Sequence, residues 1–152
     1  MSPIQFSCRQ TLDLSPEEIA EQILDLDRWP EFTGYGPLPG IKSAAFEVRT
    51  PAVVGTRIRV KNLDGSSHVE EIAEWAPENR LRMHMSQFSP PLSRLAESFD
   101  ETWEFTRRDG RTRVVRSFQL HAKSALARPL LWLIARFLKR AIARHLRQMA
   151  AE

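Results

Sequence analysis

Hydrophobic and polar residues alternate over about the first ten positions of the chain. Ile4, Phe6 and Cys8 fall on one side, which is the period of a half-buried β-strand. The segment Ser15-Pro16-Glu17-Glu18 then has the form of a helix start, with an N-cap, a proline in the first turn and acids where the helix dipole favours negative charge. We therefore expect a strand and then a short helix that ends before Trp29-Pro30, because the residue before a proline avoids helical angles.

The middle of the chain, up to about residue 122, has the pattern of antiparallel strands joined by tight turns. Asp64-Gly65 and Asp109-Gly110 lie between runs of β-type residues, and Asp-Gly favours a two-residue hairpin turn. A three-residue loop is expected at 77–79. These turns predict the following cross-strand pairs: Phe105 with Val114, Trp103 with Arg116, Glu101 with Phe118, Val60 with Val69, Ile58 with Glu71, Trp75 with Leu81, Ala73 with Met83, and Glu71 with Met85.

From Lys123 onward the period is that of a helix, with an apolar side and a basic side. The apolar side comprises Leu130, Ile134, Phe137, Leu138, Ala141, Ile142, His145 and Met149. The basic side comprises Arg128, Arg136, Lys139, Arg140, Arg144 and Arg147, with Trp132 and Leu133 at its edges. The order of elements is thus strand, helix, helical turn, about six strands and one long helix, which predicts an α+β fold.

The composition limits the class of protein but does not identify a reaction or a ligand. The 152 residues, 42% of them hydrophobic and 27% charged, fit one globular domain over residues 1–152. Cys8 is the only cysteine, so no intrachain disulfide forms, and His68, His84 and His121 fall on the expected outer face without the spacing of a metal site. We expect no metal or cofactor. With no signal-like start and no apolar run long enough to span a bilayer, we expect a cytoplasmic protein.

The net charge of +3 is unevenly distributed. Residues 123–152 carry seven Lys and Arg and one acid, so the preceding residues are net acidic. A basic amphipathic helix of this kind binds anionic lipid headgroups, RNA or an acidic partner in some proteins, and in others it is only a solvated face. All four interpretations remain open at this point.

Three segments resemble the START-like superfamily, often called SRPBCC, and within it the polyketide cyclase/dehydrase-type and coenzyme-Q-binding-type proteins. They are residues 25–32, residues 69–81 and residues 110–114. The resemblance implies a helix-grip fold: a curved antiparallel sheet of six to seven strands wrapped around the long C-terminal helix, with two short helices after the first strand. It also implies a cavity between the sheet and that helix.

Candidate ligand-binding residues are those that the predicted registers and helix face turn toward this cavity, together with Tyr35, whose Gly/Pro loop borders the cavity entrance in the helix-grip proteins that the chain resembles. They are Tyr35, Glu71, Met83, Met85, Glu101, Trp103, Arg116, Phe118, Phe137 and His145. Arg116, Glu101 and Tyr35 are expected to orient a ligand, and Tyr35, between Gly34 and Gly36, to gate the entrance. The alternative is that the charged residues form a solvated pair at the rim and the others are ordinary core.

Three functions are compatible with these residues. The leading hypothesis is binding of a hydrophobic small molecule such as a lipid, an isoprenoid quinone or an aromatic polyketide. The second is a polyketide cyclase or dehydratase, with Glu101 or Glu71 as general base and Arg116 stabilising an enolate. The third is an interaction module that places the basic helix on RNA or a membrane surface.

Overall fold

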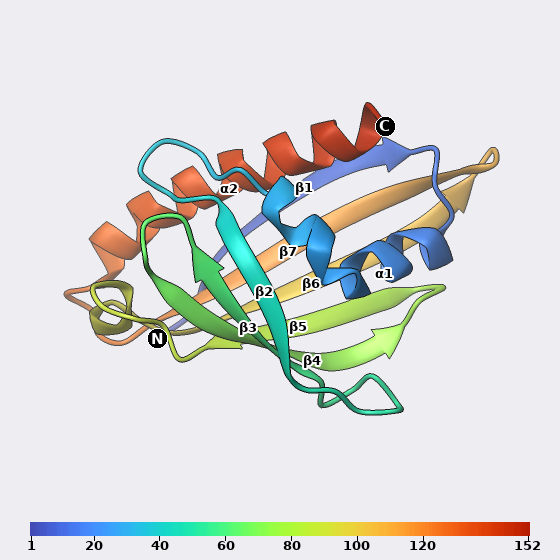
Figure 1. Cartoon of the computed structure of the whole chain (residues 1–152). Coiled ribbons are helices and arrows are strands. Elements are labelled where there is room, and N and C mark those ends of the chain that lie inside the picture. The colour runs from blue at the N-terminus through green and yellow to red at the C-terminus, as the bar shows by residue number, and fades with distance from the viewer.

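The computed structural model describes residues 1–152 and shows a seven-stranded antiparallel sheet in the order β1-β7-β6-β5-β4-β3-β2. Figure 1 shows the long helix α2 running along β1, with α1 and the 3₁₀ helix η1 in front of the sheet. This arrangement confirms the predicted helix-grip fold. The elements are β1 (Ile4–Leu12), α1 (Pro16–Leu24), η1 (Leu26–Glu31), β2 (Ile41–Val48), β3 (Arg57–Asn62), β4 (Ser67–Ala76), β5 (Arg80–Ser86), η2 (Leu92–Arg94), β6 (Ala96–Arg108), β7 (Arg111–Ala122) and α2 (Arg128–Ala150).

The first helix begins where the sequence predicts. The Ser15 hydroxyl accepts a hydrogen bond from the Glu18 backbone N–H at 3.1 Å, and the Glu18 carboxylate accepts one from the Ser15 N–H at 3.4 Å. This reciprocal capping box satisfies two N–H groups that the helix itself cannot bond. Pro16 follows in the first turn, where its missing N–H costs nothing.

The hairpin of β6 and β7 has the predicted register. Asp109 and Gly110 both have positive φ, at 54° and 76°, as a two-residue turn of this type requires. Trp103 consequently lies opposite Arg116 and Glu101 opposite Phe118. The pairing places all four of these side chains on the inner face of the sheet, toward α2.

The hairpin of β3 and β4 differs from the prediction by one residue. Its loop has three residues rather than two, because Asn62 pairs with Ser66 and only Gly65 adopts positive φ. The Asp64 carboxylate stabilises this loop by accepting a hydrogen bond from the Ser66 N–H at 2.9 Å. A slip of one residue moves every side chain of a strand to the other face.

The predicted pairs across this hairpin are therefore wrong. Ile58 lies opposite Glu70 rather than Glu71, and Val60 opposite His68 rather than Val69. On the other side of β4, Trp75 lies opposite Leu81 as predicted, but an irregularity between Ile72 and Glu74 shifts the rest of the ladder. Beyond it the pairs are Ile72 with Met83 and Glu70 with Met85, in place of Ala73 with Met83 and Glu71 with Met85.

The buried side of α2 is rotated from the predicted one. Leu131 is fully buried, whereas Leu130, which the helical period assigns to the core, is 51% exposed. The helix packs mainly along β1, so the residues facing that strand are covered. Its buried residues are Leu131, Ala135, Leu138, Ala141, Ile142, Leu146 and Met149. None of the helices has a stretch apolar and long enough to cross a membrane.

Candidate functional site

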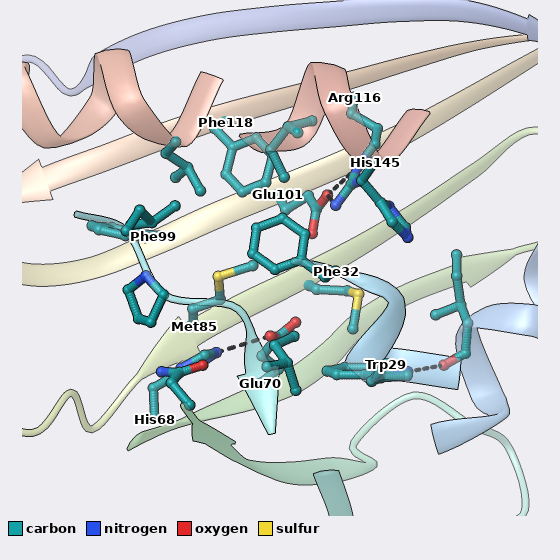
Figure 2. Close-up of a pocket in the computed structure, with 18 of the residues that line it drawn as sticks. Trp29, Phe32, His68, Glu70, Met85, Phe99, Glu101, Arg116, Phe118 and His145 are labelled. Carbon is teal, nitrogen blue, oxygen red and sulfur yellow. Dashed lines mark hydrogen bonds and ion pairs between the residues drawn. The ribbon is translucent and has the colours of Figure 1, made fainter. Parts of the chain in front are cut away.

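A pocket of about 220 Å³ lies between the inner face of the sheet, η1 and α2. Fifteen of its 26 lining residues are hydrophobic, so most of its wall offers dispersion contacts rather than hydrogen bonds. Figure 2 shows its residues converging from both sides, with Trp29 and Phe32 opposite the sheet and His145 reaching in from α2. The Trp29 indole N–H donates to the Ile23 carbonyl at 2.9 Å, which fixes this wall to the end of α1.

The apolar part of the pocket is built by neighbouring strands. Met83 and Met85 on β5 line it together with Phe99 on β6 and Phe118 on β7, and Met85 lies directly opposite Phe99. Phe99 packs against Phe88 with ring centroids 4.7 Å apart. Methionine has three rotatable bonds and a polarisable sulfur, so this wall can adapt to ligands of irregular shape.

The polar end of the pocket is a buried ion pair. Arg116 Nε lies 2.6 Å from Glu101 Oε2, and Nη2 of the same guanidinium lies 2.5 Å from that oxygen. The guanidinium also stacks over the Trp103 ring, 4.1 Å from its centroid. Removal of either charged partner would leave the other buried without compensation, which is strongly destabilising.

His145 continues this chain of polar groups. Arg116 Nη1 donates to His145 Nδ1 at 3.1 Å, so the proton of the neutral imidazole is on Nε2. Burial, together with the positive charges of Arg116 and Arg28, lowers the pKa of His145 to about 3. The imidazole is therefore neutral at physiological pH, and its Nε2–H forms no hydrogen bond within the chain.

The ionisation of Glu101 is set by opposing effects. Burial is the main cause that raises the pKa of Glu101, the Arg116 charge opposes it and the nearby Glu70 adds to it, and the net result is a pKa of about 7. The Trp103 indole N–H also favours the carboxylate, but it lies outside hydrogen-bonding geometry and is the one buried side-chain polar atom without a partner. The Trp103 N–H is buried away from the pocket surface, and the Nε2–H of His145 is left as a donor for a ligand at the polar end of the pocket.

Glu70 and His68 form a second polar group, which the sequence analysis missed. Glu70 is only 6% exposed and lines the pocket, and its carboxylate lies 2.9 Å from His68 Nε2. The prediction that His68 lies on the outer face is wrong, because the one-residue slip of β4 turns it inward. Ser66, directly after Asp64-Gly65, is the sequence feature from which both positions could have been predicted. The Asp64 carboxylate accepts hydrogen bonds from Ser66, and these stabilise a three-residue loop in place of a two-residue turn.

Seven of the ten predicted site residues line the pocket: Met83, Met85, Glu101, Trp103, Arg116, Phe118 and His145. Glu71 does not, because the same slip turns it outward, where it pairs with Arg57 at 2.9 Å. Tyr35 and Phe137 do not either. Tyr35 packs on Phe137 of α2, and Arg140 donates to its hydroxyl at 3.2 Å, so it fastens the 34–40 loop to the helix outside the pocket.

This curved sheet closed by one long helix around an apolar pocket is the helix-grip arrangement. The chain belongs to the family described as polyketide cyclase / dehydrase and lipid transport, which matches residues 3–152. None of the curated proteins matches the chain.

Solved structures share the fold at low identity. A protein from Thermus thermophilus is 18% identical with a TM-score of 0.71, and the match covers 97% of this chain and 95% of that one. A START superfamily protein from Mycobacterium smegmatis is 13% identical with a TM-score of 0.67, covering 95% and 98%. Ara h 8.0201 is 17% identical with a TM-score of 0.66, again covering 95% and 98%.

Proposed function

We propose that this protein binds a hydrophobic small molecule that carries an uncharged polar group, such as a hydroxyl or a ketone. The observation that carries the proposal is the buried Glu101–Arg116–His145 chain at one end of an otherwise apolar pocket. Burial of ligand apolar surface supplies the affinity, at roughly 25 cal/mol per Å² before ordering costs. The free Nε2–H of His145 supplies the orientation.

The charges in the pocket favour a neutral ligand over an anionic one. Arg116 is already matched by Glu101, and Glu70 adds a second carboxylate nearby. An anionic headgroup would lose its hydration without finding a free cation, which is costly. Neutral quinones and phenolic polyketides fit these groups better than fatty acids do.

The size of the pocket favours a compact ligand. Its volume of about 220 Å³ is below the ~300–1,000 Å³ of most ligand pockets. A fused ring system fits this space more readily than a long acyl chain. The adaptable Met83 and Met85 side chains provide additional room on one wall.

Calorimetric titration with 2-naphthol and 2-naphthoate at pH 8 tests this proposal, because the two share a ring system and differ in charge. We expect 2-naphthol to bind at least about tenfold more tightly, equivalent to ~1.4 kcal/mol. Glu101→Gln is expected to improve 2-naphthoate binding, because it removes one negative charge and leaves Arg116 unmatched. The control is Glu71→Gln, which changes an outward-facing glutamate.

The two parts of the proposal fail in different ways. If neither compound binds and neutral polyaromatic compounds such as anthraquinone also fail, the pocket is not a site for compact hydrophobic ligands. If 2-naphthoate binds as tightly as 2-naphthol, ligand binding stands and the preference for an uncharged group is wrong.

A second candidate function is general acid–base catalysis at Glu101, favoured by its raised pKa of about 7. In this reaction Glu101 takes a proton from the carbon next to a ligand carbonyl, and the electron pair moves onto the carbonyl oxygen. Arg116 and His145 donate to the enolate. The enolate carbon attacks a second carbonyl of the same chain, and Glu101 returns its proton to the new alkoxide.

Cyclisation of a linear aryl 1,3,5-triketone, followed by absorbance, tests this second candidate. Glu101→Gln should lower turnover to the uncatalysed rate while calorimetry still detects binding. Glu71→Gln, at the alternative base named from the sequence, should react like the unmodified protein because this side chain points away from the pocket. Undiminished turnover in Glu101→Gln would contradict the catalytic assignment.

A further inference from the structure

Exposed apolar side chains are unusually concentrated at the start of α2. Most lie in its first turns, and one lies two residues before the helix begins. Leu126 is 94% exposed, Leu130 51%, Trp132 53% and Leu133 46%. These four, the α2 apolar patch, are half of the eight large hydrophobic residues that the whole chain exposes. The opposite side of the helix is buried against the sheet through Leu131, so the patch has no partner within the protein.

Positive charges surround and follow the patch. Residues 123–151 contain seven Lys and Arg and no acid. Arg136 lies over the Trp132 ring, 5.3 Å from its centroid, and the hydrogen bond of Arg140 goes to the Tyr35 hydroxyl rather than to a carboxylate. None of the cations of α2 forms an ion pair with a carboxylate. Arg136, Lys139 and Arg140, exposed one to two turns beyond the patch, form the basic band.

We propose that the α2 apolar patch and the basic band dock this protein on the surface of an anionic lipid bilayer. In this arrangement the leucines enter the boundary between headgroups and acyl chains, and Trp132 lies at headgroup level, where its amphipathic ring is favoured. The basic band then contacts lipid phosphates. A bilayer rewards apolar insertion and cation contact side by side along one helix.

RNA fits the same surface less well. Its phosphates would satisfy the basic band, and its bases would stack on aromatic rings. Only Trp132 of the four patch residues is aromatic, and Arg136 already covers part of it. The three exposed leucines would remain in water, or RNA would cover them without a gain in binding free energy.

Docking through this surface would also place the bilayer next to the pocket wall. Leu138 and Ile142, on the buried side of the same helix, line the pocket. Leu92 of η2 lines it as well, and the neighbouring Leu95 carbonyl accepts a hydrogen bond from the Lys123 N–H at 2.9 Å, just before α2. Only a few residues therefore connect the proposed docking site to one end of the pocket.

Co-sedimentation of the full chain with vesicles tests the proposal, using phosphatidylcholine alone and phosphatidylcholine with about 30% phosphatidylglycerol, in about 0.1 M salt. We expect binding to the anionic vesicles that weakens as salt increases. Arg136→Ala combined with Lys139→Ala should weaken it about 25-fold, since each cation near such a surface contributes about fivefold in affinity. Leu130→Ser combined with Leu133→Ser should weaken binding at every salt concentration.

The control variants remove the same kinds of side chain, namely cations and a leucine, from exposed positions outside α2. Arg107→Ala combined with Arg108→Ala removes two exposed cations from the β6–β7 hairpin, and Leu63→Ser removes a leucine that is 68% exposed at the β3–β4 turn. Both controls should bind vesicles like the unmodified protein. All of these positions are exposed, so unchanged thermal midpoints will show that the variants are folded.

Three results would overturn the proposal. The first is vesicle binding that is absent, or equal in all variants. The second is binding to single-stranded RNA that depends on the basic band and not on Leu130 and Leu133, which would make the surface an RNA site. The third is a dimer in analytical ultracentrifugation that dissociates on Leu130→Ser and Leu133→Ser, which would show that a second copy covers the patch.

Discussion

At the scale of single residues, the pocket depends on which member of an adjacent pair points inward. Glu70 and Glu71 have the same side chain and differ only in face: Glu70 lines the pocket and Glu71 pairs with Arg57 on the outside. Composition and hydropathy cannot distinguish them. The length of one turn decides between them, because a single added loop residue reverses the faces of β4.

The pH dependence of stability is expected to report the buried carboxyl of Glu101. Its pKa is about 7 in the folded protein and 4.5 when exposed, so between these values the folded state binds more protons than the unfolded state. Stability from this group therefore falls as pH rises from 4.5 to 7, by on the order of 3 kcal/mol, and is level above pH 7.

Urea unfolding of the unmodified protein and of Glu101→Gln, at intervals from pH 4.5 to pH 8, measures this contribution. The lowered pKa of His145 acts in the opposite direction, raising stability as pH rises toward 6.5, but it is common to both proteins and cancels in their difference. The difference should shrink steadily up to pH 7. A difference independent of pH would show that Glu101 is not held in its protonated form.

At the scale of elements, the first turns of α2 have a buried apolar side and an exposed apolar side, and the sequence pattern does not distinguish them. The apolar residues of its first turns are consistent with either a buried or an exposed stripe, because Leu130, Leu131 and Leu133 together surround much of the helix. The sequence predicts the helix and its second half correctly, with Leu138 and Ile142 buried. It misplaces the first half because the covered side depends on where β1 lies, and β1 comes from the opposite end of the chain.

Adjacent leucines on α2 provide a direct test of this orientation. Leu131→Ala should destabilise the protein by about 2–5 kcal/mol, because it empties a fully buried position. Leu130→Ala, which removes the same atoms from a half-exposed position, should change stability by less than about 0.5 kcal/mol. Equal losses in denaturant unfolding would mean that the helix is rotated from the orientation described.

The hairpins illustrate what turn chemistry predicts at this scale. For β6 and β7, Asp109-Gly110 gives the correct register from the turn as far as Ser98 and His121, and with it the positions of Glu101, Trp103 and Arg116. For β3 and β4, the same dipeptide occurs in a longer loop because Ser66 gives Asp64 a different partner. A dipeptide signal alone does not distinguish the two loops.

At the scale of the whole molecule, the fold could be predicted from the sequence more completely than the site. Element order and periodicity indicate a sheet closed by a terminal helix, and the structure confirms it. The pocket needs two further facts, namely the rotation of α2 and the face of β4. The rotation of α2 is decided by packing against β1 from the far end of the chain, and the face of β4 by the length of the β3–β4 loop.

Ligand binding should stabilise the molecule as a unit, because the pocket joins the sheet, η1 and α2. A ligand present at about 100 times its Kd stabilises the folded state by about 2.7 kcal/mol. For a chain of this length the melting temperature should rise by roughly 5–10 °C. Differential scanning calorimetry with and without 2-naphthol measures the shift, and an unchanged melting temperature at saturation would contradict binding to the native pocket.

The neighbourhood of β1 and α2 has a consequence for synthesis of the protein. β1 pairs with β7, and the Cys8 thiol donates to the Lys139 carbonyl at 3.4 Å, so the earliest and latest elements are in direct contact. During translation the β-strands leave the ribosome before α2, which forms one wall of the pocket. The inner face of the nascent sheet is therefore open until α2 emerges, so the pocket is complete only when the last strand and α2 have both packed against β1.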